Sequence, residues 1–284
     1  MGESPAPGSF AARVASAVAA TGPLCAGIDP SSDLLHRWGL TDDPDGLRRF
    51  GLRCVEAFAG VVPVVKPKVA FFERFGSAGL AALEAVVAEA RSAGLLVIGD
   101  AKRGDIGTTM EAYASAWLDP DSPLAVDAVT AVAYLGLGAL EPEFDLAARH
   151  GLGVIVVVRS SNPEGRTLQE ARTDDGKGPA IEDHLLDAIA HLNSGPRAGT
   201  VGAVVGATLQ PSAFHLPDLG GVILAPGVGA QGAGAAEVGA LFAGCPPGSV
   251  LASASRSVLG AGPDVTALAD AAGAAREEMR AALG

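Results

Sequence analysis

The segment Asp100–Thr109 places a lysine, Lys102, between two carboxylates, Asp100 and Asp105. It follows the apolar run Gly94–Gly99, which is typical of a buried strand. Side chains alternate between the two faces of a strand, so Asp100 and Lys102 are expected to project the same way. An ammonium group held among carboxylates can stabilise negative charge that develops on a substrate, and it can donate a proton. A solvated charge cluster on a loop is the alternative interpretation.

Lysine usage favours the functional interpretation. The chain has four lysines against sixteen arginines, so it does not depend on lysine for surface charge. Two of the other lysines, Lys66 and Lys68, stand at the end of a second apolar run, Gly60–Val65. The sequence thus places lysines where strands are expected to end.

Short apolar runs of strand type alternate along the chain with longer segments of helical period. The runs expected as strands are Leu24–Asp29, Val61–Lys66, Leu95–Asp100, Ala125–Val132, Gly153–Arg159, Val201–Gly206, Gly221–Leu224 and Ser249–Ala252. Helices are predicted between them, for example over Pro44–Ala59 and Gly79–Ala93, and a last helix over Val265–Leu283. Eight apolar strands separated by helices indicate an α/β fold of the (β/α)8 TIM barrel type. A doubly wound sheet is the alternative, but Gly27–Pro30 stands where that fold commonly has a G-x-G-x-x-G motif.

In a TIM barrel the active site lies at the carboxyl ends of the strands. Polar residues end most of the predicted strands, at Asp29, Lys66, Asp100, Lys102, Arg159–Pro163, Pro226–Gly232 and Ser253–Ser257. The loops after strands seven and eight commonly bind phosphate through backbone N–H groups, and here they carry a glycine-rich turn and Arg256. A phosphomonoester site is therefore expected. A tight turn without a ligand is the alternative for the glycine-rich segment.

Composition limits the class of protein. At 284 residues and 49% hydrophobic content, with no evident linker, residues 1–284 are expected to form a single barrel domain. A net charge of −12 argues against broad binding to nucleic acid or to an anionic membrane. Three cysteines without C-x-x-C spacing predict neither a disulfide framework nor a zinc site, and they fit a cytoplasmic location. No uncharged run reaches membrane length without a Gly or Pro break.

Together these motifs resemble the orotidine 5′-phosphate decarboxylase family, and in particular its larger bacterial subgroup. The resemblance rests on Gly27–Pro30, Lys66–Glu73, Asp100–Thr109, Ser161–Pro163, Pro226–Gly232 and Arg256. It implies decarboxylation of orotidine 5′-monophosphate to uridine 5′-monophosphate, the final step of de novo pyrimidine nucleotide biosynthesis, without metal or cofactor. It also implies a homodimer with active sites shared between subunits.

The resemblance further implies the roles of individual residues. The catalytic set would be Lys66, Asp100, Lys102 and the partner subunit's Asp105. Asp29 and Thr109 would contact the ribose hydroxyls, with Thr109 acting across the dimer, and Ser161 would contact the pyrimidine edge. The phosphate would be bound by Gln231, Gly232 and Arg256. Without that family context, a helix or loop cap is the alternative for Asp29, Thr109 and Ser161.

Three further segments carry expectations. The long polar loop 162–178 is expected to be a mobile lid that closes over the nucleotide. Lys68 is expected to be structural or solvent-facing, because the family often has an uncharged polar residue there. Ala131–Ala133 departs from the polar residue and proline usual in close relatives before Tyr134, so no role is assigned to it.

The implied reaction explains why such an array is needed. Loss of CO₂ from carbon 6 of the pyrimidine leaves a carbanion that no carbonyl delocalises, so the enzyme must supply electrostatic stabilisation and a proton. Lys102, kept protonated by Asp100 and Asp105, is expected to do both. The implied barrier reduction is about 20 kcal/mol or more, so binding energy from the remote phosphate is expected to contribute.

Other functions remain open from sequence alone. Magnesium-dependent sugar-phosphate lyases and decarboxylases of the same superfamily retain D-x-K-x-x-D, but they generally have a carboxylate at the end of strand two, where this chain has Lys66. An inactive nucleotide-binding barrel would be expected to have lost a charged position, and none is lost. A Schiff-base aldolase is disfavoured because flanking acids would keep Lys102 protonated.

Overall fold

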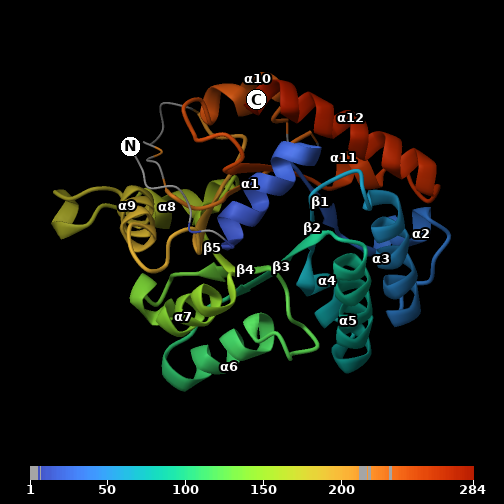
Figure 1. Ribbon diagram of the computed structural model, residues 1–284, viewed down its shortest axis with the longest axis horizontal. Helices are drawn as coiled ribbons and strands as arrows, with labels where there is room; N and C mark the ends of the chain where they lie inside the picture. Colours follow the sequence, from blue (N-terminus) through green and yellow to red (C-terminus); the bar gives the residue numbers. More distant parts are fainter. Residues whose placement is uncertain (1–5, 7, 211–215, 217–218, 230–231) are drawn as a thin grey trace.

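The computed structural model describes residues 6, 8–210, 216, 219–229 and 232–284. In this part of the chain, eight parallel strands close into a barrel in the order β1 to β8, and β8 pairs with β1. Helices connect the strands and surround the barrel (Figure 1). The protein is therefore a (β/α)8 barrel, as the alternation of apolar runs and helical segments predicts.

The strands are β1 Leu24–Ile28, β2 Val64–Pro67, β3 Leu96–Arg103, β4 Ala128–Val132, β5 Gly153–Arg159, β6 Val201–Val205, β7 Ile223–Pro226 and β8 Val250–Ala254. The α-helices are α1 Phe10–Thr21, α2 Ser32–Arg37, α3 Pro44–Phe58, α4 Val69–Glu73, α5 Gly76–Ser92, α6 Gly107–Leu118, α7 Glu141–His150, α8 Arg166–Gln169, α9 Ile181–Asn193, α10 Ala235–Leu241, α11 Arg256–Leu259 and α12 Val265–Leu283. Short 3₁₀ helices are η1 Leu137–Leu140, η2 Pro163–Gly165 and η3 Asp174–Gly176.

Some strand boundaries differ from the predicted ones. β2 begins at Val64 and not at Val61, because Pro63 has no N–H to donate to a neighbouring strand. β4 begins at Ala128 and not at Ala125. β3 continues past Asp100 to Arg103, with a shift of register against β4 after Gly99. This extension places Lys102 inside the strand.

The interior of the barrel is filled by apolar side chains below its carboxyl end. One buried cluster joins residues of successive strands, namely Cys25, Val64, Ile98, Ala128, Ile155, Val204, Leu224 and Leu251. Phe10 and Val14 of α1 belong to the same cluster, and α1 lies across the barrel in Figure 1. A Cβ at Gly153 would lie 2.4 Å from the Phe10 ring, so glycine is needed there for α1 to pack. The amino-terminal end of the barrel is therefore closed.

Polar contacts fix α1 in this position. Arg13 forms an ion pair with the buried Asp127, whose Oδ2 accepts a hydrogen bond of 2.9 Å from the backbone N–H of Val97 in β3. The N–H of Ala11 donates to the carbonyl of Gly199 at 3.0 Å. Asp127 thus links α1 to β3 at the amino-terminal end of the barrel.

The outer layer packs the apolar faces of the helices against the strands. α3 begins with Pro44 after Asp43, whose side chain accepts a hydrogen bond from Gly46 N at 2.8 Å. Gly51 allows α3 and α5 to approach, since a Cβ there would lie 2.3 Å from Val86. These contacts belong to a second, larger buried cluster outside the barrel wall.

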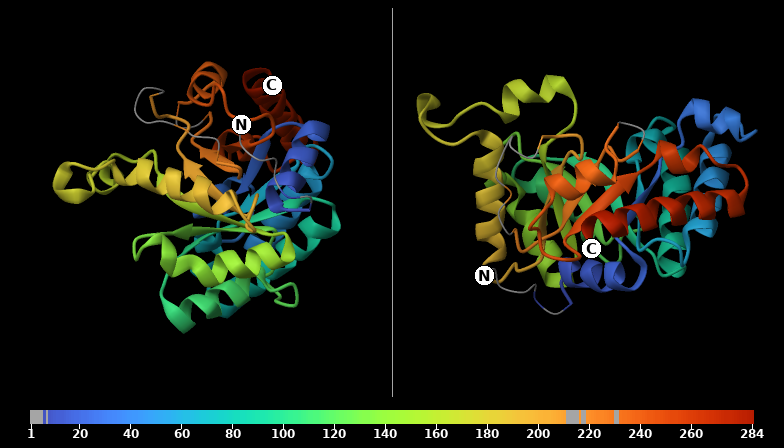
Figure 2. Two further views of the ribbon diagram at one scale, coloured as in Figure 1. Left: turned by 60° about the vertical axis from the view of Figure 1, so that its left-hand side comes forward. Right: turned by 90° about the horizontal axis from the view of Figure 1, so that it is seen from above.

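The two ends of the barrel differ in what covers them. In the right-hand view of Figure 2, α1 lies at one end and the olive segment that contains α8 projects at the other. This segment follows β5, so it stands at the carboxyl ends of the strands. The end that α1 leaves open is therefore the end where this fold places active sites.

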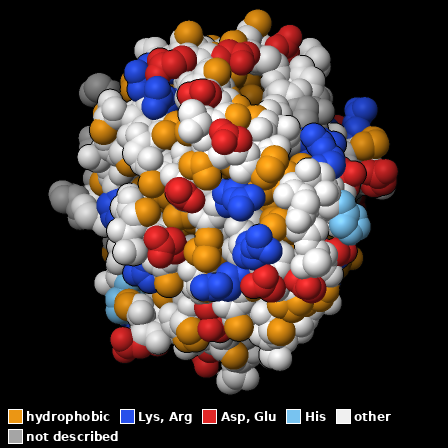
Figure 3. Space-filling view, turned by 90° about the vertical axis from the view of Figure 1, so that its right-hand side faces the viewer, with side chains coloured by type: hydrophobic (Ala, Val, Ile, Leu, Met, Phe, Trp, Pro, Cys, Tyr) orange, Lys and Arg blue, Asp and Glu red, His pale blue; other side chains and the backbone are white. Residues whose placement is uncertain are grey.

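The surface carries mixed charges on the face that Figure 3 shows. Lys and Arg side chains are interspersed there with Asp and Glu, and neither sign forms a continuous area. Among the described residues, no helix is both long enough and apolar enough to cross a membrane.

Candidate active site

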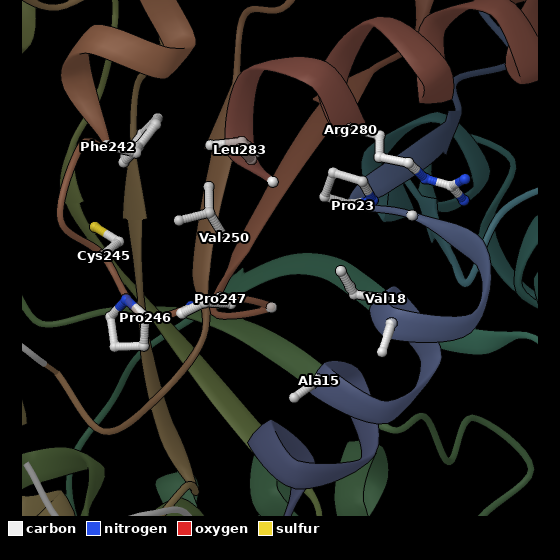
Figure 4. A pocket seen from close by; sticks show the side chains of 14 residues that line it. Ala15, Val18, Pro23, Phe242, Cys245, Pro246, Pro247, Val250, Arg280 and Leu283 are labelled. Carbon is white, nitrogen blue, oxygen red and sulfur yellow. The ribbon is translucent and has the colours of Figure 1, made fainter.

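Two cavities of similar size differ in their chemistry. One, of about 270 Å³, lies beside α1 and the segments that precede β1 and β8, at the amino-terminal end; apolar residues such as Val18, Phe242 and Leu283 line it together with Arg280 (Figure 4). The other, of about 290 Å³, lies at the carboxyl ends of β1, β2, β7 and β8. Its lining includes the charged residues Asp29, Lys66, Lys68 and Arg256. The second cavity is the candidate active site.

A single carboxylate, Asp100, organises the charges at this end. Its Oδ2 lies 3.3 Å from Lys66 Nζ and 3.8 Å from Lys68 Nζ, while its Oδ1 forms an ion pair with Lys102 Nζ. The hydroxyl of Thr130 also donates to Asp100 Oδ1 at 3.2 Å. Three ammonium groups from β2, β3 and the residue after β2 therefore surround one buried carboxylate.

Burial and charge act in opposite directions on this cluster. Burial is the largest single effect and disfavours the charged forms of Lys66 and Asp100. Their mutual attraction outweighs it only together with other charges, chiefly Lys102 at Asp100 and Asp29 at Lys66. The result is a raised pKa for Lys66 and a lowered pKa for Asp100. Both groups are therefore charged throughout the neutral range.

Lys66 and Lys102 differ in exposure, which suits them to different tasks. The Lys66 side chain lines the cavity but is 5% exposed, so its ammonium mainly contacts its protein neighbours. The Lys102 side chain is 52% exposed in the described chain, so its ammonium can also meet a ligand. Sequence analysis predicted the contact between Lys102 and Asp100, and the structure places the two side chains together.

The backbone at Lys102 adopts a left-handed conformation, with φ of 51°. Such a φ is unfavourable for a residue with a side chain and is commonly retained where a functional geometry requires it. The N–H of Lys102 donates to Thr130 Oγ1 at 3.0 Å, which holds this conformation. Thr130 therefore positions both members of the Asp100 and Lys102 pair.

Thr130 was missed by the sequence analysis. It is the one hydroxyl-bearing residue of β4 and stands two positions after Ala128, whose side chain belongs to the interior cluster. Strand alternation would therefore have placed Thr130 on the inner face near Asp100. That signal was present in the sequence.

The structure places Lys68 beside the candidate site, a position to which sequence analysis gave no site role. Its Nζ lies 3.8 Å from Asp29 Oδ2 and 3.8 Å from Asp100 Oδ2, and its side chain is 36% exposed. The physical reason is the period of the strand: Lys66 and Lys68 are two residues apart and share a face. Asp29 itself lies at the end of β1, with Oδ1 buried and without a hydrogen-bond partner among the described residues.

The cavity lining also includes a cation, Arg256, without an ion-pair partner among the described residues. Arg256 follows β8, is exposed, and makes no ion pair or hydrogen bond with the described residues. Pro226, Gly227 and Val228 line the cavity next to it. A guanidinium and a nearby glycine-rich backbone suit a phosphate group.

The glycine-rich turn is closed on itself in this structure. Gly229 N donates to Ala233 O, and Gly232 N donates to Gly229 O, each at 2.9 Å. The Gly232 amide would therefore have to be shared or released to contact a ligand, and its predicted role stays a prediction. Gln231 lies outside the described residues.

Comparison with known proteins identifies the family to which this site belongs. The model of the orotidine 5′-phosphate decarboxylase / HUMPS family matches residues 22–271. The chain belongs to this family. It is 54% identical over 276 residues to an orotidine 5′-phosphate decarboxylase of Salinispora tropica, covering 97% of this chain and 98% of that protein.

Solved structures of the family share the fold over the whole chain. A crystal structure from Streptomyces avermitilis, provisionally named an orotidine 5′-phosphate decarboxylase, is 49% identical with a TM-score of 0.91, covering 100% of this chain and 97% of that one. Leishmania donovani OMP decarboxylase is 28% identical with a TM-score of 0.75, covering 96% and 98%.

Of the described residues that the family resemblance assigns to the site, six do not line this cavity: Asp100, Lys102, Asp105, Thr109, Ser161 and Gly232. Asp100 and Lys102 are nevertheless joined to it, because Asp100 pairs with the lining residues Lys66 and Lys68. Asp105 is half-buried, forms no ion pair with Lys102 of its own chain, and accepts a hydrogen bond of 2.8 Å from Ile106 N. Thr109 is exposed in the first turn of α6. Ser161 lies near Gly206 at the end of β6, where a Cβ would be 3.1 Å from Ser161 N.

The segment expected to be a lid has local structure and is attached to β5. Glu170 forms an ion pair with the buried Arg159, and the Gln169 side chain accepts a hydrogen bond of 3.1 Å from Ser160 N. Arg159 also lies 3.2 Å from the buried Glu182 of α9. Arg159, at the end of a strand, therefore anchors the segment and does not line the cavity. Movement of the segment stays a prediction.

Proposed function

We propose that this chain decarboxylates orotidine 5′-monophosphate to uridine 5′-monophosphate, the final step of de novo pyrimidine nucleotide synthesis, without a metal or cofactor. The observation that carries the proposal is the group of three lysines around Asp100, together with Arg256, which lines the same cavity as Lys66 and Lys68 and has no ion pair with the described residues. Family membership and the high identity to named decarboxylases support it. A metal-free reaction requires positive charge from the protein itself, and this cavity supplies it.

In the proposed reaction, the bond between carbon 6 and the carboxylate breaks and CO₂ leaves, while the electron pair stays on carbon 6. The Lys102 ammonium stabilises this negative charge as it develops and then transfers a proton to carbon 6. The neutral amine regains its proton from water. Asp100 holds Lys102 in place through their ion pair. Lys66 stays protonated because its pKa is raised, and its positive charge in turn lowers the pKa of Asp100 and keeps that carboxylate ionised.

Binding energy from the rest of the nucleotide would support this step. Arg256, with Gln231 and Gly232, would hold the phosphate, while Asp29 would accept a ribose hydroxyl. The cavity brings Asp29 and Arg256 together with Lys66 and Lys68 in about 290 Å³. Interactions remote from the reacting carbon can be used to lower the barrier when they fix the ring against Lys102.

The proposal includes a homodimer in which the partner subunit's Asp105 and the partner subunit's Thr109 complete each site, while Ser161 contacts the pyrimidine edge. Ile106, next to Asp105, is 61% exposed, and Tyr134 and Leu135 after β4 are 77% and 54% exposed. Large apolar side chains this exposed are typical of interfaces. They lie in the loops after β3 and β4, on the same end of the barrel as Lys102.

The domain organisation and lid belong to the same proposal. Residues 1–284 would act as one barrel domain, and segment 162–178 would close over the bound nucleotide. Its attachment through Arg159 and Glu170 gives the segment a fixed base from which to move.

A magnesium-dependent reaction is the rival that the same family of barrels raises. Lys66 and Lys68 place two ammonium groups against Asp100, where such enzymes would need anionic ligands for the cation. Among the described residues, no three His, Cys, Asp or Glu side chains are grouped so as to hold a metal ion. The charges present therefore favour the reaction without metal.

The test is a spectrophotometric assay of purified protein with orotidine 5′-monophosphate in excess EDTA. Wild type should be fully active, and Lys102→Ala should lose at least about 10³-fold in kcat, since both charge stabilisation and proton transfer are lost. Asp100 keeps Lys66 in this variant, so the fold should persist. Arg48→Ala, on the exposed face of α3, is the matched control for loss of one positive charge.

Two results would contradict the proposal. Activity that disappears in EDTA and returns with magnesium would favour the metal-dependent rival. A folded Lys102→Ala variant with wild-type kcat would remove Lys102 from the reaction.

A further inference from the structure

Lys68 is held rigidly at the edge of the candidate site by its backbone. Its N–H donates to the carbonyl of Ile28 in β1 at 3.1 Å, and the residue forms a parallel bridge with Asp100 of β3. It directly follows β2 and precedes α4. The backbone of Lys68 is therefore fixed between three elements that each carry a charged site residue.

The Lys68 ammonium has charge partners but no hydrogen-bond acceptor among the residues whose structure is described. Its distances of 3.8 Å to Asp29 Oδ2 and to Asp100 Oδ2 are too long for hydrogen bonds, and Nζ makes none with the described residues. An ammonium has three N–H donors, so these donors are available. The side chain is 36% exposed and lines the cavity, which makes them accessible to a ligand.

Asp29 is the complementary half of this arrangement. Its Oδ1 is buried and has no hydrogen-bond partner in the part of the chain that the structure describes, and its side chain is 14% exposed, so Oδ2 is the oxygen that a ligand can reach. That oxygen is the one that faces Lys68. A donor and an acceptor thus stand 3.8 Å apart at the wall of one cavity.

We infer that Lys68 and Asp29 bind one sugar hydroxyl of the nucleotide between them, and that Lys68 determines the preference of the site for that hydroxyl. This inference rests on the proposed function. A hydroxyl is both a donor and an acceptor, so it can accept from Lys68 Nζ and donate to Asp29 Oδ2 at the same time. Neither a carbonyl nor a second carboxylate could make both bonds.

The arrangement separates sugar recognition from the chemical step. Lys66 at 3.3 Å and Lys102 both remain on Asp100 when Lys68 is removed. Loss of Lys68 should therefore weaken binding of the sugar hydroxyl. A hydrogen bond between a neutral hydroxyl and a charged group typically changes affinity by about 10- to 100-fold.

The experiment compares uridine 5′-monophosphate with its 2′-deoxy and 3′-deoxy analogues as competitive inhibitors of wild type, Lys68→Met and Arg48→Met. Wild type should bind one of the two analogues roughly 10- to 100-fold less tightly than the ribonucleotide. In Lys68→Met this ratio should fall about tenfold, because the ribonucleotide loses the hydrogen bond from Lys68 while the deoxy analogue loses nothing further. Arg48→Met removes the same charge from an exposed face of α3 and should keep the wild-type ratio.

The outcomes separate this inference from the proposed function. A Lys68→Met variant that binds all three nucleotides more weakly by one common factor, or that keeps the full wild-type ratio, overturns the role of Lys68. In a double-mutant cycle of Lys68→Met with Asp29→Asn, the losses of binding free energy should be non-additive for uridine 5′-monophosphate. They should be additive for the deoxy analogue that wild type binds less tightly. Additive losses for both nucleotides would also overturn the role of Lys68. Failure of wild type to decarboxylate orotidine 5′-monophosphate would instead reject the proposed function.

Discussion

Glu143 is a buried carboxyl group whose ionisation should destabilise the fold. It lies on the inner face of α7 beside Phe144, and its side chain is fully buried. Neither carboxyl oxygen has a hydrogen-bond partner among the described residues. Burial raises the pKa of Glu143 from 4.5 to about 8. The group is therefore neutral in the folded protein under conditions where it is ionised in the unfolded chain.

The sign of the pH dependence follows from proton binding. Between pH 4.5 and pH 8 the folded protein retains a proton on Glu143 that the unfolded chain has lost, so the free energy of unfolding falls as pH rises through this window. The difference between the two pKa values lowers the free energy of unfolding by about 1 kcal/mol at pH 5 and about 4 kcal/mol at pH 8. Local relaxation around the ionised Glu143 carboxylate reduces this loss of unfolding free energy, to about 2 kcal/mol at the lower end at pH 8.

Glu143→Gln retains the shape of the side chain but cannot ionise. The variant should gain little stability at pH 5 and about 2–4 kcal/mol at pH 8. Urea unfolding at the two pH values measures the difference, with Glu278→Gln on the exposed side of α12 as the control. The comparison at two pH values separates ionisation from the polarity of the buried amide, which is the same at both. An equal gain at pH 5 and pH 8 would refute the reasoning.

The remaining predictions concern the site and the closed end of the barrel. Arg256→Ala should reduce the advantage of uridine 5′-monophosphate over uridine as an inhibitor by about 10- to 100-fold, and an unchanged ratio would place the phosphate elsewhere. Lys102→Ala and Asp105→Ala should each be inactive. If the sites are shared between subunits, mixing the dissociated subunits of the two variants should restore about a quarter of wild-type activity, because each mixed dimer has one intact site. No recovery in confirmed mixed dimers would place Asp105 in its own subunit's site. Gly153→Ala should lower the free energy of unfolding by about 1–3 kcal/mol through its clash with Phe10, measured by urea unfolding, whereas a neutral effect would mean that α1 moves freely.

Much of the fold could be predicted because parallel barrels have a strong local signature. Each strand is buried on both faces, so the apolar runs stand out, and the helices between them retain their own period. The exact ends were harder to predict. β2 starts late at Pro63 because of a missing N–H, and β3 runs on to Arg103 because Thr130 of β4 binds the Lys102 N–H.

The sequence by itself determined which residues carry the charge. Asp100 and Lys102 share a face because strand alternation is a local rule, and Lys66 and Arg256 stand at strand ends that must meet at one end of a barrel. Only the tertiary structure decided how these charges are distributed. Lys66 is buried and Lys102 is exposed, although both bind the same carboxylate.

Tertiary structure also decided the charge partners of Lys68, because strand period places it on the same face as Lys66 but does not determine which carboxylates it meets. Its contacts with Asp29 and Asp100 join residues that lie far apart along the chain, and they exist because β1, β2 and β3 are adjacent in the barrel. The burial of Glu143 depends in the same way on how α7 packs against its neighbours. Spacing along a sequence determines which face a side chain occupies, but its charge environment depends on groups that only packing brings within a few ångströms.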